Sequence, residues 1–76
     1  MSTRTFDPQV LRRIRLERGL SQTKLSKAVG LYSTAVGLME NGHNGPSVTT
    51  LAALADVLDA SMDDFMTRSD SEAVAA

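Results

Sequence analysis

The sequence has no cysteine and no tryptophan, and its 76 residues include only one histidine. Without cysteine, neither a disulfide framework nor a thiolate metal site can form, and one histidine cannot supply a cluster of imidazole ligands. Only 4% of the residues are aromatic, so an apolar core must consist of Leu, Val, Ile, Ala and Met. We therefore expect no metal ion and no other cofactor, and the residues offer no catalytic constellation of an enzyme.

Long apolar segments are also missing. No run approaches the roughly 18 to 20 apolar residues that cross a bilayer, and Arg4 is not followed by the apolar stretch of a signal peptide. A chain of this length suffices for one small domain. The sequence therefore predicts a cytoplasmic domain over residues 1–68 with no membrane association. A small, acidic, non-periodic tail follows over residues 69–76, and we expect it to be disordered.

Charge is unevenly distributed, although the formal net charge is only −1. Residues 1–27 hold seven cationic and two acidic side chains, whereas residues 28–76 hold one cationic and seven acidic ones. Such asymmetry favours a protein that turns one face toward a polyanion and another face away from it. Two solvated faces without a partner explain the same distribution, so charge alone leaves both interpretations open.

Apolar residues recur at helical spacing, and we expect an all-α fold of five short helices without strands. Ser and Asp side chains cap free N–H groups where helices begin, and Gly ends helices in the left-handed conformation. The predicted starts are Asp7, Ser21, Ser33, Ser47 and Ser61, and the predicted ends include Gly19, Gly30 and Glu40. The expected inward-facing residues are Leu25, Ala28 and Val29 in the second helix and Leu51, Leu54, Ala55 and Leu58 in the fourth.

The second and third predicted helices are separated only by the residues Gly-Leu-Tyr at 30–32. So short a junction forces a steep angle between the two helices. That geometry is typical of a helix-turn-helix, whose second helix enters the major groove of DNA. Tight helical corners also occur in other all-α proteins, and the spacing of further residues is therefore needed.

Residues 10–66 resemble the lambda-repressor/Cro-like (xenobiotic-response-element type) helix-turn-helix family. The matching residues are Arg15, Gly19-Leu20-Ser21-Gln22, Leu25, Gly30, Val36, Glu40-Asn41-Gly42, Pro46-Ser47 and Leu51. The resemblance implies a bundle of five short helices that binds double-stranded operator DNA, usually as a symmetric dimer. It also implies a sequence-specific, repressor-like transcriptional regulator that reads the major groove with residues 33–40.

The resemblance assigns roles to Gln22, Arg15 and Glu40, apart from the base-reading positions. Gln22 matches a glutamine that contacts DNA at the edge of the groove, where free N–H groups at a helix start suit a phosphate; a solvated glutamine is the alternative. Thr23 and Lys24 beside it can add phosphate contacts. Arg15 and Glu40 match an internal ion pair, which we prefer to a phosphate-binding arginine because a buried carboxylate needs a partner.

The base-reading positions of the family fall here on Tyr32, Ser33, Thr34, Gly37 and Leu38, and the following residues Asn41 and His43 can lie near a phosphate. From Gly30 to Met39 there is no Lys, Arg, Gln or Asn. Ser and Thr discriminate weakly between bases, whereas apolar side chains can contact thymine methyl groups. We therefore expect a T-rich half-site, modest specificity, and a large share of the affinity from phosphate contacts.

Two alternatives remain open from the sequence. The chain is either a DNA-binding regulator or a protein-interaction module that keeps the fold without specific DNA reading. A homodimer is expected for the regulator, because one recognition helix covers few base pairs. Its contact surface would consist of Leu58, Met62, Phe65 and Met66, unless these four residues complete the core of the monomer.

Overall fold

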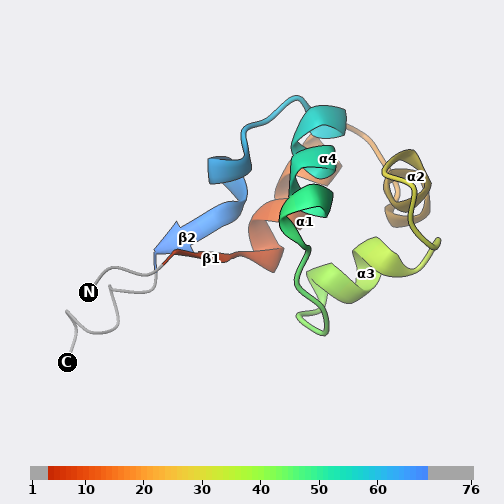
Figure 1. Ribbon diagram of the computed structural model, residues 1–76. Helices are drawn as coiled ribbons and strands as arrows, with labels where there is room; N and C mark the ends of the chain where they lie inside the picture. The colour runs from red at the N-terminus through yellow and green to blue at the C-terminus, as the bar shows by residue number, and fades with distance from the viewer. Residues whose placement is uncertain (1–3, 69–76) are drawn as a thin grey trace.

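Four α-helices form the body of the computed structural model, which describes residues 4–68 (Figure 1). In chain order the elements are β1 (Arg4–Phe6), α1 (Pro8–Glu17), α2 (Gln22–Ala28), α3 (Ala35–Glu40), α4 (Val48–Leu58), the 3-10 helix η1 (Met62–Phe65) and β2 (Met66–Arg68). The all-α fold class is confirmed, although the number of α-helices is four rather than five. The predicted tail, residues 69–76, lies outside the described residues.

The predicted helix starts are confirmed where a side chain caps the first turn. Asp7 Oδ1 accepts from the Gln9 backbone N–H at 2.9 Å. Ser21 and Ser47 cap α2 and α4 in the same way, accepting from backbone N–H groups three residues onward. Gly30, which ends α2, has a φ of +77°, a left-handed conformation that side-chain-bearing residues rarely adopt. Local chemistry thus decides where α1, α2 and α4 begin.

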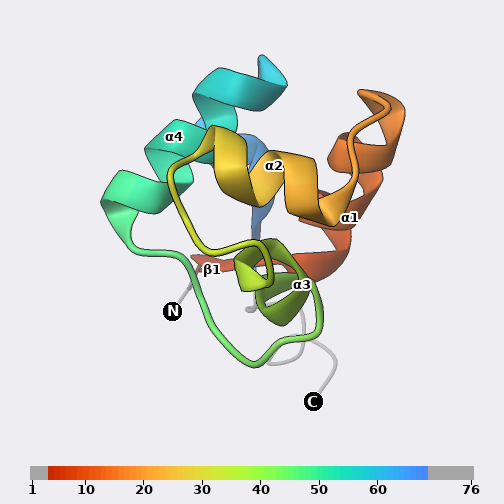
Figure 2. The same cartoon turned by 90° about the vertical axis from the view of Figure 1, so that its right-hand side faces the viewer.

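The core lies where α1, α3, α4 and η1 meet beneath α2 (Figure 2). The predicted stripe of α4 is confirmed, because all four of its members are buried. The fully or almost fully buried core residues are Leu11, Ile14, Leu25, Val36, Met39, Leu51, Leu54, Ala55, Leu58 and Phe65. The expected inward face of α2 was partly wrong, since Ala28 is exposed and Ser26 is buried instead.

A two-stranded sheet that the sequence did not predict joins the two ends of the described chain (Figure 1). Strands β1 and β2 pair antiparallel, with Thr5 opposite Thr67 and Phe6 opposite Met66. The Asp7 backbone N–H continues the ladder by donating to the Phe65 carbonyl at 2.8 Å. Each strand has three residues, too few for an alternating pattern to be visible, and the pairing partners are about sixty positions apart.

The third and fifth predicted helices are shorter than expected. Helix α3 begins at Ala35 rather than Ser33, because Ser33 and Thr34 form a turn in which Ala35 N–H donates to the Tyr32 carbonyl at 3.0 Å. In place of the fifth α-helix there is the single 3-10 turn η1, which Ser61 and Asp64 close with a capping box. The chain then leaves helical conformation at Met66 and enters β2.

The proposed dimer surface was wrong for two of its four residues. Leu58 and Phe65 have no solvent-exposed area and belong to the core of the monomer. Met62 and Met66 pack against that core but are only half-buried, so part of each side chain stays exposed. A second copy therefore cannot contact the side chains of Leu58 and Phe65. Among residues 4–68, no helix is both long enough and apolar enough to cross a membrane.

Candidate nucleic-acid interface

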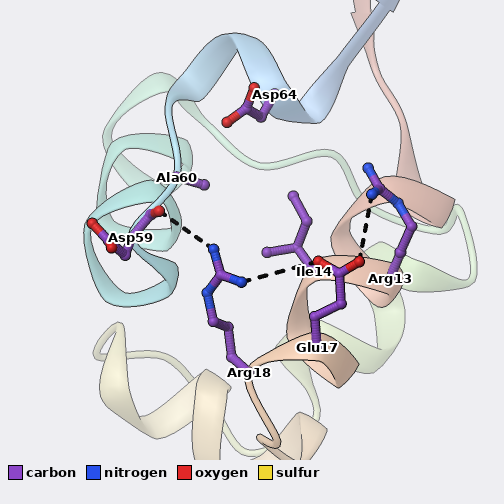
Figure 3. A pocket seen from close by; sticks show the side chains of 7 residues that line it. All are labelled: Arg13, Ile14, Glu17, Arg18, Asp59, Ala60 and Asp64. Atoms are coloured by element: carbon purple, nitrogen blue, oxygen red, sulfur yellow. Dashed lines mark hydrogen bonds and ion pairs between the residues drawn. The ribbon is translucent and has the colours of Figure 1, made fainter.

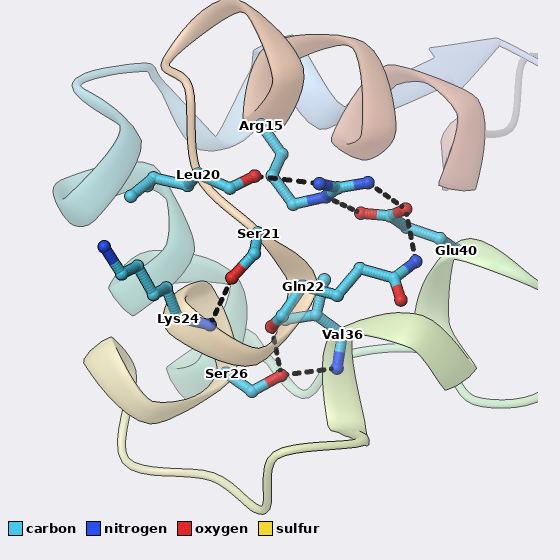
Figure 4. Close-up of polar contacts among 8 residues, drawn as sticks. All are labelled: Arg15, Leu20, Ser21, Gln22, Lys24, Ser26, Val36 and Glu40. Atoms are coloured by element: carbon cyan, nitrogen blue, oxygen red, sulfur yellow. Dashed lines mark hydrogen bonds and ion pairs between the residues drawn. The ribbon is translucent and has the colours of Figure 1, made fainter.

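The corner between α2 and α3 is fixed by a buried hydroxyl. Ser26 Oγ accepts from the Val36 backbone N–H at 3.0 Å and donates to the Gln22 carbonyl at 2.8 Å (Figure 4). One hydroxyl therefore satisfies an N–H in the first turn of α3 and ties it to the preceding helix. Because a hydrogen bond is directional, it fixes the angle between the two helices more closely than apolar packing alone does. Ser26 was not predicted as a site residue, since a serine inside a helix looks like an ordinary solvated residue.

Arg15 and Glu40 form a buried ion pair that connects α1 to the end of α3. Arg15 Nε donates to Glu40 Oε2 at 2.6 Å, and a second guanidinium nitrogen donates to Oε1 at 3.0 Å. The third nitrogen donates to the Leu20 carbonyl at 2.8 Å. The side chains are only 8% and 3% exposed, so Arg15 has no open path to a phosphate. This geometry matches the internal pair that the resemblance implied.

Gln22 joins this ion pair from the first position of α2. Its Nε2 donates to Glu40 Oε1 at 3.1 Å, and its side chain lies against α3 at Gly37 (Figure 4). The residue itself remains exposed. Thr23 and Lys24 are exposed as well, but the Lys24 side chain extends from α2 on the side away from α3 (Figure 4). Gln22 is therefore the predicted contact residue of α2 that the structure brings next to α3.

The outward face of α3 consists of small and apolar groups. Residues Thr34, Leu38 and Asn41 follow one another at intervals of four and three, which places them on the same face of a helix. Thr34 and Asn41 are exposed, and Leu38 is 39% exposed although it is apolar. The opposite face, formed by Val36, Met39 and Glu40, is buried. Because Thr34 makes no side-chain capping bond, its hydroxyl is available to a ligand.

The segments on both sides of α3 bring the other predicted residues near this face. Tyr32 stands in the turn before the helix and is 87% exposed, and Ser33 beside it is exposed too. After the helix, the His43 backbone N–H donates to the Leu38 carbonyl at 2.9 Å, which folds the loop back toward α3. The His43 side chain remains exposed.

Two cationic side chains of residues 1–27, those of Arg13 and Arg18, lie away from the outward face of α3. Arg18 Nε donates to the Leu58 carbonyl at 2.7 Å, which secures the end of α4, and Arg13 pairs with Glu17 at 3.6 Å. Both line an open polar pocket of about 290 Å³ between α1, the end of α4 and η1 (Figure 3). The other lining residues are Ile14, Glu17, Asp59, Ala60 and Asp64. None of the predicted DNA-contact residues lines this pocket, so charge counting overstated the cations available near α3.

The resemblance drawn from the motifs is confirmed by comparison with known proteins. A family model described as helix-turn-helix matches residues 11–65. The chain belongs to this helix-turn-helix family. Over 73 residues it is 40% identical to the HTH-type transcriptional regulator PrpR of Mycobacterium tuberculosis, a match covering 96% of the chain and 15% of that protein. The chain therefore spans about 15% of the length of this relative.

Solved structures of this helix-turn-helix fold superpose closely. The restriction-modification controller protein C.AhdI from Aeromonas hydrophila has a TM-score of 0.72 and 34% identity, covering 76% of this chain and 88% of that chain. The P22 c2 repressor, solved in complex with a synthetic operator, has a TM-score of 0.71 and 27% identity, covering 78% of this chain and 89% of that chain. The helix-turn-helix chain is thus built like known transcriptional regulators.

Proposed function

We propose that this helix-turn-helix domain is a sequence-specific, DNA-binding transcriptional regulator that places the outward face of α3 in the major groove of an operator. The observation that carries the proposal is the way α3 is held. Ser26 fixes its first turn and Arg15 fixes its last residue, while its outward face, with Thr34, Leu38 and Asn41, stays exposed. A recognition helix must be held rigidly from behind if small side chains are to discriminate between bases. Family membership supports the same function.

The contact surface that we propose combines base and backbone contacts. Thr34, Gly37 and Leu38 face the bases, together with Ser33 and Tyr32 from the preceding turn. Asn41 and His43 beside this face, and the exposed residues Thr23 and Lys24 of α2, contact the sugar–phosphate backbone. Such phosphate contacts position a protein on the duplex, whereas specificity comes from groove contacts and from DNA shape.

Selection of duplexes from a random pool, followed by fluorescence anisotropy, tests this function. We expect one preferred half-site, enriched in A·T pairs, and binding to random duplex that weakens steeply with added salt. A chain without any affinity for duplex DNA at low salt is not a DNA-binding protein, and such a result would overturn the proposal.

We further propose that two copies bind one operator. Two half-sites about 34 Å apart give the affinity that one short recognition helix lacks. Met62 and Met66 are the half-buried apolar residues of the originally expected surface that a second copy can still contact. Sedimentation of the complex with a duplex carrying two half-sites should give two chains per duplex. One chain per duplex at saturation would exclude this stoichiometry.

A protein-interaction module is the second candidate function, and one observation favours it. Tyr32 and Leu38, beside and within the outward face of α3, are exposed apolar residues, and no cationic side chain lies between them. Exposed apolar side chains often mark protein contacts. The same anisotropy experiment separates the two candidates, because a protein-interaction module would show no sequence preference among duplexes.

A further inference from the structure

Gly37 is a glycine within α3 that the backbone does not require. The described glycines with positive φ are Gly19, Gly30 and Gly42, and Gly37 is not among them. Its conformation is that of an ordinary helical residue, and alanine would form this helix more readily than glycine. The reason for a glycine at this position must therefore lie outside the helix.

The Gln22 side chain supplies that reason. A Cβ added at Gly37 would lie 3.1 Å from Gln22 Oε1, closer than most such atoms approach, and in ordinary van der Waals contact with Gln22 Cδ at 3.5 Å. Gly45 resembles Gly37 in lacking a positive φ, but a Cβ added at Gly45 would have no neighbour within 4 Å. Gly37 thus leaves a gap on α3 into which the amide of a residue from α2 fits.

The orientation of this amide is fixed by Glu40. A carboxylate accepts hydrogen bonds and cannot donate them, so the end of the Gln22 amide that faces Glu40 must be the NH₂ group. Glu40 is itself held by two hydrogen bonds from Arg15. Gln22 Oε1 must therefore lie on the side of Gly37, where no described residue donates to it. One N–H of the NH₂ group donates to Glu40, and the other N–H remains available to a ligand.

The position of Gly37 places this amide at the edge of the proposed reading face. Gly37 directly precedes Leu38 and follows Thr34 by three residues, one helical turn. Leu38 and Thr34 are exposed on the outward face, whereas Glu40 is buried behind it. An acceptor oxygen held beside Gly37 consequently faces the same ligand as Thr34 and Leu38.

We propose that Gln22 reads an adenine through the gap left by Gly37, so that α3 obtains its hydrogen-bonding side chain from α2. Oε1 accepts from the adenine N6 amine, and the remaining N–H donates to N7, which is the pairing that glutamine makes in the major groove. Cytosine offers the amine without the second acceptor and should bind less well. This inference rests on the proposed function, because it concerns the base specificity of the same surface.

The test compares three variants in selection from a random duplex pool. The unmodified chain should prefer adenine at one position of the selected half-site by about 5- to 150-fold over other bases. Gln22→Ala should abolish the preference at that position alone. Gly37→Ala should reduce it at the same position, because the new methyl forces the amide to shift by a few tenths of an ångström. Gly45→Ala, the matched control with open space around the methyl, should keep it.

Circular dichroism verifies that each variant is folded, which we expect because the displaced Gln22 amide can turn into solvent. Modified adenines in the duplex selected by the unmodified chain give a second readout that needs no variant. Removing the 6-amino group, or replacing N7 by carbon, should each weaken binding of the unmodified chain and leave binding of Gln22→Ala unchanged.

Two results would overturn the inference while leaving the proposed function intact. In the first, Gln22→Ala weakens binding equally for all sequences, as loss of a phosphate contact would. In the second, Gly37→Ala retains the adenine preference, so the gap is not needed for reading. If the unmodified chain binds no duplex at all, the proposed function itself fails, and this outcome is distinct from the other two.

Discussion

The two ends of the helical body are held together in different ways. At the α2–α3 corner, directional polar contacts decide the geometry, namely the Ser26 hydroxyl and the ion pair of Arg15 with Glu40. At the α4–η1 end, the fully buried side chains of Leu58 and Phe65 do so, and Arg18 adds hydrogen bonds to backbone carbonyls. Apolar burial is non-directional, whereas hydrogen bonds specify orientation. The difference indicates that orientation matters most beside the proposed DNA surface.

The largest expected effect comes from breaking the buried ion pair at the corner. Glu40→Ala leaves the Arg15 guanidinium buried without its partner, and we expect a loss of about 3–5 kcal/mol in the free energy of unfolding. Glu17→Ala is the matched control, because its ion pair with Arg13 lies on the surface. That control should cost at most about 1 kcal/mol. Urea denaturation followed by circular dichroism measures both losses. Equal losses would contradict the expected difference between the buried and the surface ion pair.

Removing the corner hydroxyl should have the next largest effect. In Ser26→Ala the buried Val36 N–H loses its acceptor, and we expect a loss of about 1–3 kcal/mol in the free energy of unfolding. DNA affinity at a temperature where the variant is folded should fall as well, because the angle between α2 and α3 is no longer fixed. Thr23→Ala, an exposed change on the same helix, should alter stability by less than about 0.5 kcal/mol. An unchanged melting temperature in Ser26→Ala would remove this role for the hydroxyl.

A smaller effect on binding is expected from contacts between α3 and thymine methyl groups. Replacing thymine by uracil at the half-site centre removes one methyl group, whose burial is worth roughly 0.8 kcal/mol. We expect specific binding to weaken by about that amount, measured by fluorescence anisotropy. Leu38→Ala should reduce this sensitivity to uracil without changing affinity for random duplex. Equal affinity of uracil and thymine operators would show that Leu38 does not read methyl groups.

The smallest expected effect concerns the cations. If three or four of the cations in residues 1–27 neutralise phosphates in each subunit, a dimer should show a slope of log K against log salt of about −5 to −7. Arg13 and Arg18 lie at the polar pocket rather than beside α3, and we therefore expect the shallow end of this range. Lys24→Ala should make the slope shallower by about 0.9 for each chain bound, whereas Arg13→Ala, the same change in charge, should leave it unaltered. Identical slopes for Lys24→Ala and Arg13→Ala would show that Lys24 contacts phosphates no more than Arg13 does, which would contradict this prediction.

The sequence predicted those parts of the fold that depend on neighbouring residues. Asp7, Ser21 and Ser47 cap helices because their side chains reach N–H groups two or three residues onward. The pairing of β1 with β2 was missed, since it joins the opposite ends of the chain and three-residue strands carry no periodic signal. The burial of Phe65 also depends on tertiary packing that spacing alone cannot decide.

For the candidate site, the sequence pointed to single residues but not to the contacts between them. The motif placed Gln22 and Gly37 in the site separately, but only the folded chain brings them together. Ser26 was overlooked because a helical serine carries no sequence signal for burial. The start of α3 was placed two residues early, since Thr34 adopts a helical conformation without making a capping bond. Contacts between α2 and α3 explain the first two differences, and the local turn before α3 explains the third.

The most direct test of the central claim, that the outward face of α3 binds DNA, is a titration of the ¹⁵N-labelled chain with the selected duplex, followed by NMR. Backbone amide shifts should be largest at Thr34, Gly37, Leu38 and Asn41, and small at Asp59 and Asp64 beside the polar pocket. The largest shifts at Asp59 and Asp64, with those of α3 unchanged, would contradict the account.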